Sequence, residues 1–199
     1  MDNQIIISIG REYGSGGRYI AELIADELGI ELIDKNLLEK IRDEKQIDTS
    51  SYENYDEKPA KRSISSKRGR FTNSVSDALA EIEWDYLKEK AEKGDSFVIV
   101  GRCAEYVLKD NPNLLAVFVE ADEKDKLKRI VDEYGIEEYQ ADSVRKVTDQ
   151  ERRKYHNQYA EYKWGDSRGY HMCINSSRFG IPATAVIIAE AAMKMKWDV

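Results

Sequence analysis

The chain has 199 residues, of which 41% are hydrophobic and 35% charged, and its formal net charge is −7. This length suits a single domain over residues 1–199 with a sizeable core. The acidic balance excludes a general electrostatic attraction to nucleic acid or to anionic membranes, so any phosphate site has to be local.

Two features indicate the compartment. No apolar stretch approaches the ~20 residues that cross a bilayer, and residues 1–4 carry no basic leader segment. Cys103 and Cys173 are far apart and no histidine cluster accompanies them, which favours reduced thiols over a disulfide or a metal site. We therefore expect a cytoplasmic protein that has no membrane partner and no metal ligands of its own.

The first predicted element is a buried strand at residues 5–9, followed by a glycine-rich turn at 10–18 and a helix that ends at Gly29. The helix places Ile20, Leu23, Ile24 and Leu28 on its apolar side. In α/β proteins this order forms a phosphate cradle, because glycines let successive N–H groups converge on an anion at the positive end of the helix. The candidate nucleotide-binding residues are Gly10, Arg11, Gly14, Ser15, Gly16, Gly17, Arg18 and Tyr19.

This turn departs from the usual G-x-x-G-x-G-K-[ST] pattern of a P-loop. When Gly14 and Gly16 are aligned with the G-x-G of that pattern, Gly17 stands at the lysine and Arg18 at the magnesium-binding hydroxyl. An arginine can bind two phosphate oxygens through its forked donors, which makes Arg18 the candidate for the role of the lysine. The alternative is a tight strand-to-helix turn with Arg18 in solvent.

A short strand at 31–34 ends in Asp34, a helix follows at 36–42, and residues 43–72 form a polar stretch without apolar periodicity. We expect this stretch to be a mobile insert or a lid. Its segment 58–70 holds six basic and no acidic residues, which is typical of a solvated loop. A cover for phosphates and a nucleic-acid contact are the alternatives. The second is weak because the chain is acidic and no aromatic residues are interleaved.

Strands and helices alternate through the rest of the chain. Helices are predicted at 74–93, from Asp122 to Gly135, at 142–163 and from about Pro182, and strands at 97–100, 115–119 and 172–175. The last helix has Val186, Ile187, Ala191 and Met195 as candidate buried positions. Continuous apolar strands that alternate with helices indicate a parallel sheet with helices on both faces. Ligands bind at the carboxyl ends of such strands, so we expect one cleft ringed by Arg11, Asp34, Gly101, Arg102, Asp122, Asn175, Ser176 and Ser177.

These residues resemble the cytidylate kinase-like family, a branch of the P-loop nucleoside monophosphate kinases. The likeness covers nearly the whole chain, and its motifs are the loop at 10–18, Asp34 with Lys35, the segment 98–102, Asp149 with Arg152 and Tyr155, and residues 164–175. The resemblance implies a P-loop NTPase-like α/β fold with a helical lid at 124–165 and the acceptor-binding or lid insert at 43–72.

The resemblance also implies transfer of a phosphoryl group from ATP to a nucleoside monophosphate. CMP is the nominal acceptor, and Mg²⁺ is carried mainly by phosphate oxygens and water. The loop would bind the donor phosphates, Asp34 and Lys35 would begin the acceptor segment, and Arg102 would meet the acceptor phosphate. Lid arginines would act on the transferring group. These are Arg129, Arg145, Arg152 and Arg153, and the candidate catalytic residues are Arg18, Arg152 and Arg153.

Other interpretations stay open at this point. Because the lysine is absent, a nucleotide-binding regulatory or sensory domain with little turnover is the second hypothesis, and a nucleic-acid-associated protein is the third. Asp34 is equally placed to cap the next helix, and Arg152 and Arg153 to pair with Asp149. The tyrosines at 155, 159 and 162 fit packing better than base stacking. The expected partner is a small nucleotide or phosphate compound, and the oligomeric state is open.

Overall fold

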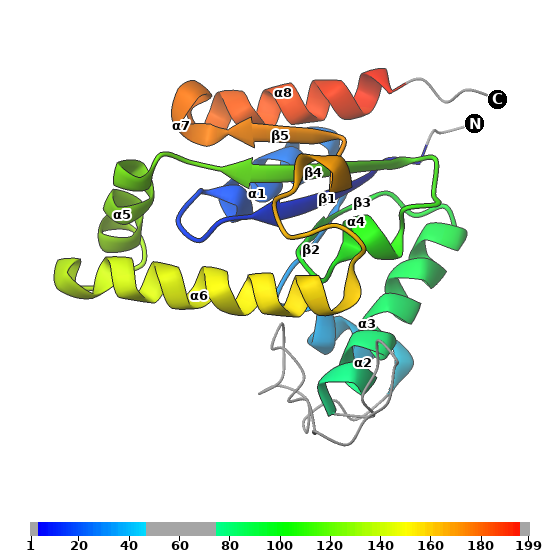
Figure 1. Ribbon diagram of the computed structural model, residues 1–199. Coiled ribbons are helices and arrows are strands. Elements are labelled where there is room, and N and C mark those ends of the chain that lie inside the picture. The colour runs from blue at the N-terminus through cyan, green and yellow to red at the C-terminus, as the bar shows by residue number, and fades with distance from the viewer. Residues whose placement is uncertain (1–3, 47–74, 196–199) are drawn as a thin grey trace.

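Five parallel strands form the centre of the computed structural model, which describes residues 4–46 and 75–195 (Figure 1). They are β1 (Ile6–Arg11), β2 (Glu31–Ile33), β3 (Phe97–Val100), β4 (Leu114–Glu120) and β5 (Met172–Asn175), in the order β2-β3-β1-β4-β5. The strand that leads into the glycine-rich turn pairs with β3 on one side and β4 on the other. The turn therefore leaves the middle of the sheet, and the predicted parallel α/β fold is confirmed.

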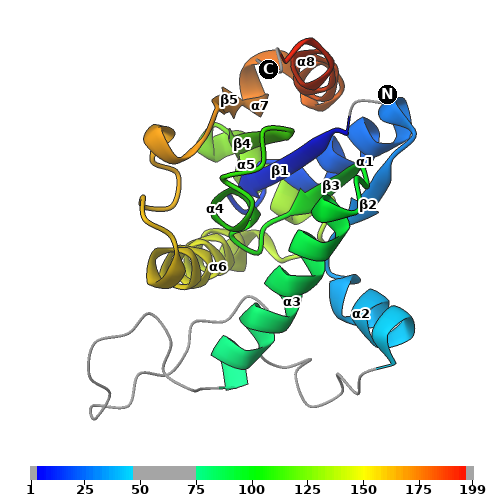
Figure 2. The same ribbon diagram turned by 90° about the vertical axis from the view of Figure 1, so that its right-hand side faces the viewer.

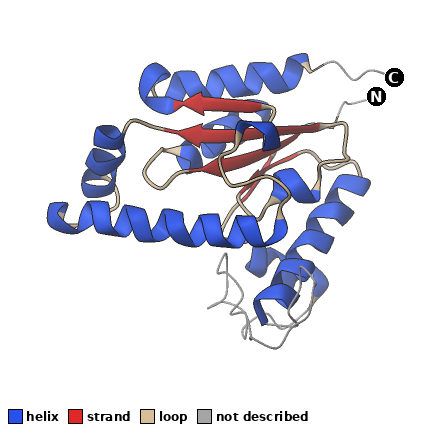
Figure 3. Cartoon of the chain, viewed as in Figure 1, coloured by secondary structure: helices blue, strands red, loops and turns tan. Residues whose placement is uncertain are grey.

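Helices link the strands, and the alternation is visible in Figure 3. They are α1 (Gly17–Leu28), α2 (Leu37–Lys45), α3 (Val75–Glu92), α4 (Ala104–Val107), α5 (Glu123–Asp132), α6 (Glu138–Tyr159), α7 (Ser176–Phe179) and α8 (Ile181–Lys194), with a 3₁₀ turn at Ser167–Gly169. In Figure 1 the arrowheads of β4 and β5 point to the side where α5 lies. The carboxyl ends of the strands thus face the region of α5 and the glycine-rich turn.

Alternate residues of the strands pack into two apolar layers, one on each face of the sheet. Ile7 and Ile9 of β1 pack with α1 and α8, whereas Ile6 packs with α3 and α4 on the opposite face. Figure 2 shows α8 and α6 on opposite sides of the sheet. A third cluster joins α6 to α3 through Trp84, Tyr155 and Tyr159. The predicted packing role is confirmed for the two tyrosines, while Tyr162 is 42% exposed.

The element boundaries differ from the predictions at three places. The long helix predicted at 142–163 is Glu138–Tyr159, because the backbone turns extended at Ala160. α2 continues to Lys45, so the predicted insert at 43–72 begins in a helix, and its residues from 47, with the basic run 58–70, lie outside the described residues. Leu23 and Val186, expected in the apolar layers, are 41% and 51% exposed. Neither lies on the side of its helix that packs on the sheet.

No helix within residues 4–46 and 75–195 is long and apolar enough to cross a membrane.

Candidate functional site

The turn between β1 and α1 has the backbone that its glycines predict. Gly14 and Gly16 adopt φ values of 81° and 79°, in the left-handed region that L side chains rarely occupy. A Cβ on Gly14 would also lie 2.8 Å from the carbonyl oxygen of Lys126 in α5. Glycine at this position is therefore required both by conformation and by the close approach of α5.

The N-terminus of α1 leaves backbone donors available. The Ile20 amide donates to the Gly16 carbonyl at 3.0 Å, but the amides of Gly17, Arg18 and Tyr19 find no acceptor among the described residues. Together with the positive end of the helix dipole, such amides form a ready anion site. Ser15 is fully buried and supports the turn: its hydroxyl donates to the Glu12 carbonyl at 2.8 Å.

One cavity of about 270 Å³ opens beside this turn. It brings together residues from β1, the turn, α1, the segment after β2, and α6. Its lining residues are Arg11, Glu12, Tyr13, Gly14, Gly16, Gly17, Arg18, Tyr19, Asp34, Lys35, Val100, Tyr134 and Arg152. Most of the predicted nucleotide-binding residues thus meet the predicted acceptor residues in a single space.

Arg18 is held at the edge of this cavity by two carboxylates. Its Nε donates to Asp34 Oδ2 at 2.6 Å, and its Nη2 lies 2.9 Å from Glu22 Oε1. The hydrogen bond to Asp34 is the main cause that raises the pKa of the guanidinium. Asp34 therefore binds Arg18 with its side chain, which decides against its alternative interpretation as a side-chain cap of α2.

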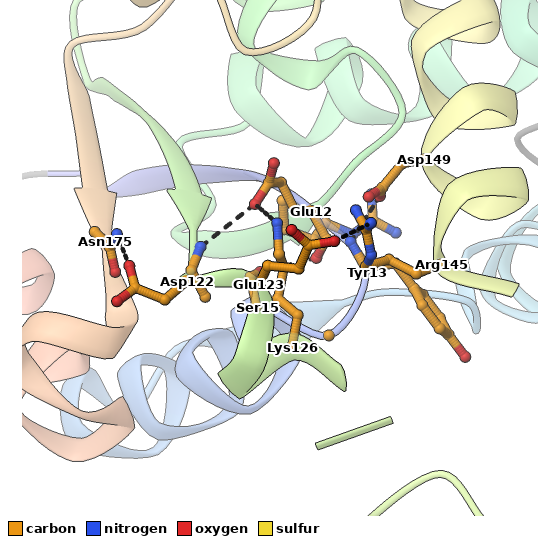
Figure 4. A network of polar contacts seen from close by, with 12 residues as sticks. Glu12, Tyr13, Ser15, Asp122, Glu123, Lys126, Arg145, Asp149 and Asn175 are labelled. Atoms are coloured by element: carbon orange, nitrogen blue, oxygen red, sulfur yellow. Dashed lines mark hydrogen bonds and ion pairs between the residues drawn. The ribbon is translucent and has the colours of Figure 1, made fainter. Parts of the chain in front are cut away.

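Side chains of α5 and α6 contact the loop at four successive residues, 11 to 14, and Figure 4 shows Lys126 beside Glu12 and Asp149 beside Tyr13. Arg152 Nη1 donates to the Arg11 carbonyl at 3.3 Å, Lys126 Nζ lies 2.7 Å from Glu12 Oε2, and Asp149 Oδ1 accepts from the Tyr13 amide at 2.7 Å. Arg129 donates to the Gly14 carbonyl. The loop conformation is thus fixed from outside as well as by its glycines.

Burial changes the acidity of the groups in this contact. Desolvation raises the pKa of the Asp149 carboxyl, although the Tyr13 amide and the charge of Arg152 act in the opposite direction. Burial also raises the pKa of the Tyr13 phenol, whose ring packs 5.3 Å from that of Tyr134. These two tyrosines therefore form an uncharged wall of the cavity.

The cleft expected from all strand ends is divided in the structure. Asp122 and Asn175 hydrogen-bond each other at 3.0 Å, and neither lines the cavity; the expectation of one ring was wrong for them. Asp122 does precede α5 as its N-cap residue, but its side chain makes no capping hydrogen bond. The strands end at one edge of the sheet, but the side chains at β4 and β5 bond each other, whereas those at β1 and β2 line the cavity.

Three predicted arginines are engaged elsewhere. Arg102 is 3% exposed and its Nη1 lies 2.9 Å from Glu83 Oε1, so it points into the protein. Arg145 pairs with Glu123 at 2.9 Å and with Asp142 at 2.6 Å. The guanidinium of Arg153 lies 5.4 Å from the ring centre of Trp164. Gly10 and Arg102 line a separate small cavity that also includes Arg11 and Arg152.

A side chain at position 17, where the usual pattern has its lysine, would collide with Arg11. A Cβ on Gly17 would lie 2.6 Å from the Cβ of Arg11, an atom that no side-chain rotation can move away. The P-loop pattern alone shows that the lysine is missing but not that Arg11 occupies the space beside position 17. Sequence reasoning also missed Lys126 and Tyr134, since one polar residue on a charged helix and one tyrosine carry no distinguishing pattern.

The strand order, the central glycine loop at the start of α1 and the helices on both faces define a P-loop-type α/β fold of the kind found in small-molecule kinases. The chain belongs to the cytidylate kinase-like family, whose model matches residues 6–178. An uncharacterized protein from Eubacterium ventriosum is similar at 33% identity over 96% of this chain and 99% of its own, with a TM-score of 0.76.

Two shikimate kinases share the fold at lower identity. That of Bacteroides thetaiotaomicron matches at 15% identity and a TM-score of 0.55, covering 95% of this chain and 98% of its own. That of Acinetobacter baumannii, solved in complex with shikimate, matches at 14% identity and a TM-score of 0.51, covering 98% and 97%. A comparison with curated proteins gives no significant match.

Proposed function

We propose that this protein transfers a phosphoryl group from ATP to a small acceptor, with nucleoside monophosphates such as CMP as the first candidates. The cavity beside the glycine loop is the observation that carries the proposal. Its cationic side chains are Arg11, Arg18, Lys35 and Arg152, against the two carboxylates of Glu12 and Asp34. The cavity thus has a local excess of positive charge, although the chain as a whole carries a net charge of −7. Phosphoryl transfer requires the protein mainly to position the reactants and to stabilise negative charge, and these cations can do the second.

The donor phosphates belong at the loop. The free amides of residues 17–19 and the left-handed glycines fit an anion that approaches the backbone closely. Gly14, Ser15 and Gly16 form the wall of this cradle, and Arg129 reaches it through the Gly14 carbonyl. Arg18 and Arg152 flank it and are proposed to stabilise the transferring group.

The acceptor belongs next to Asp34 and Lys35, across the cavity from the loop. For the roles that the family resemblance implies, Arg102 would have to leave Glu83, Arg145 would have to leave Glu123, and Arg153 would have to leave the Trp164 ring. Within the described residues no three His, Cys, Asp or Glu side chains gather to hold a metal ion. Mg²⁺ is therefore proposed to bind through phosphate oxygens and water, where it would neutralise developing charge.

A regulatory nucleotide-binding domain is the second candidate. Two observations favour it. Arg11 leaves no room for a lysine side chain at position 17, and Arg18, the candidate for the role of that lysine, pairs with Asp34 and Glu22. Such a domain would bind ATP with the same amides but would not turn it over.

The two candidates are separated by one assay. The full chain is incubated with ATP, Mg²⁺ and one acceptor at a time, and ADP release is followed; the acceptors are the four nucleoside monophosphates, shikimate and phosphate. We expect acceptor-dependent ADP release that Arg152→Ala abolishes and that Lys154→Ala, an exposed position on the same helix, leaves unchanged. ATP binding by calorimetry without ADP release from any acceptor would support the regulatory domain instead. Absence of both would reject the site.

The compartment follows from the proposed reaction. Neither Cys103 nor Cys173 forms a disulfide, which fits the reducing, ATP-containing cytoplasm that we propose for this protein.

A further inference from the structure

Asp149 of α6 is the most buried acidic contact of the glycine loop. It is 6% exposed, and its Oδ1 accepts a hydrogen bond of 2.7 Å from the backbone amide of Tyr13. A hydrogen bond between a charged group and an uncharged amide is stronger than one between neutral groups. The carboxylate therefore fixes the main chain of the loop one residue before Gly14, where the left-handed turn begins.

The same helix holds the loop at a second point. Arg152, three residues after Asp149, donates to the Arg11 carbonyl at 3.3 Å, and its guanidinium lies 5.5 Å from the ring centre of Tyr13. Residues three apart project from one face of a helix. One face of α6 thus contacts residues 11 and 13 of the loop, through their backbone and through the Tyr13 ring.

This contact lies outside the reacting atoms. Residues 17–19, whose amides have no acceptor among the described residues, line the cavity, whereas Asp149 does not. We propose that Asp149 is a positioning residue, which holds the Tyr13 amide and so keeps the loop in the shape that presents the α1 amides to the donor phosphates. This inference rests on the proposed function for its ligand, a polyphosphate chain, but the loop contact itself does not.

The test uses the full chain and three variants. Asp149→Ala removes the acceptor, Asp149→Asn retains an acceptor oxygen without the charge, and Glu151→Ala removes an exposed acid from the same helix as a control. Amide hydrogen exchange of residues 11–16 is measured without ligand. Affinity for inorganic tripolyphosphate is measured by calorimetry, and KM for ATP and kcat are measured wherever turnover is found.

We expect exchange at Tyr13 to be about tenfold faster or more in D149A, in line with the loss of a charge-assisted hydrogen bond. Tripolyphosphate affinity should fall and KM for ATP should rise by a similar factor of about ten, with a smaller change in kcat. D149N should restore most of the protection, and E151A should match the parent. If D149A does not fold, Asp149→Ser, which withdraws the oxygen from the amide, takes its place.

Parent-like exchange at residues 11–16 in D149A would overturn the proposal, and so would D149N behaving like D149A. Faster exchange with unchanged tripolyphosphate affinity would also overturn it, because the contact would then be structural only. Failure of the proposed function has a different signature. In that case the parent itself neither binds tripolyphosphate nor turns over ATP, while the exchange comparison still decides whether Asp149 holds the loop.

Discussion

The packing of Arg11 against Gly17 predicts that even a methyl group at position 17 disturbs the loop. Gly17 is the first residue of α1 and its φ is not left-handed, so alanine is allowed by the backbone. The new Cβ would nevertheless stand 2.6 Å from Arg11 Cβ and 3.2 Å from Arg11 Cγ. Only the Cγ contact can be relieved by a rotation, because the Cβ position follows from the backbone of β1.

Two opposing terms set the size of the effect. Replacing glycine by alanine in a compatible helix position stabilises a protein by about 0.4–1 kcal/mol, mainly through the unfolded chain. Overpacking by one methyl group destabilises it by about 1–3 kcal/mol. The clash should dominate, and Gly17→Ala should lower the free energy of unfolding by about 1–2 kcal/mol while weakening tripolyphosphate binding.

A double-mutant cycle measured by urea unfolding tests the cause. Arg11→Ala keeps the Cβ and should leave most of the effect of Gly17→Ala, whereas Arg11→Gly removes the Cβ and should abolish it. The expected coupling in the glycine cycle is about 1–3 kcal/mol. Additive effects of Arg11→Gly and Gly17→Ala would refute the steric explanation of the missing lysine, and so would a Gly17→Ala variant that is more stable than the parent.

Three further predictions concern the charges around the loop. Arg18→Ala should lower nucleotide affinity or turnover by about one to two decades, because it removes a charge-assisted contact. It should change the free energy of unfolding by under about 1 kcal/mol, because the Arg18 side chain is half exposed. Parent-like nucleotide binding by a folded R18A protein would contradict this. Lys126→Met should destabilise the protein by about 1–3 kcal/mol in urea unfolding, and adding Glu12→Gln should recover part of that loss. If the losses of the two substitutions were additive, the ion pair of Lys126 and Glu12 would have no net coupling. The raised pKa of Asp149 means that the folded state disfavours the ionised carboxyl, so the parent should lose stability relative to D149N as pH rises from about 4 through that pKa. The measurement is urea unfolding of both proteins at several pH values. A difference in free energy of unfolding that does not vary with pH would argue against the burial effect.

The fold was predictable because its signals are local and repeated. Apolar runs at 97–100 and 172–175 match β3 and β5 without adjustment, and Gly29 ends α1 in a left-handed conformation, as its position after the last helical turn indicates. Periodicity was less reliable for single positions. Leu23 continues the apolar repeat of α1, but it lies off the side of the helix that packs on the sheet and is exposed.

The candidate site was only partly predictable, because half of it depends on which helix approaches the loop. The glycine pattern identifies the amides, and the strand ends identify Asp34. Nothing in the sequence shows that Asp149 accepts from a backbone amide instead of pairing with Arg152 or Arg153 along the helix, since both arrangements use the same spacing. The position of Arg102 could not be predicted from the sequence either, because its burial against Glu83 depends on how α3 packs.

Arg11 and Gly17 are best understood as one unit. In the usual pattern a lysine at the start of the helix extends over the loop toward the phosphates. Here the space above the helix start is filled by the base of the Arg11 side chain, which comes from the end of β1 and lines the same cavity. The positive charge is thus present at the loop, but it is carried by a different element. The Arg11 side chain starts from the end of β1, and its guanidinium is a planar fork of donors, whereas a lysine at the start of a helix presents a point charge. We propose that Arg11 and Arg18, which both line the cavity, together supply the positive charge that the lysine supplies in the usual pattern.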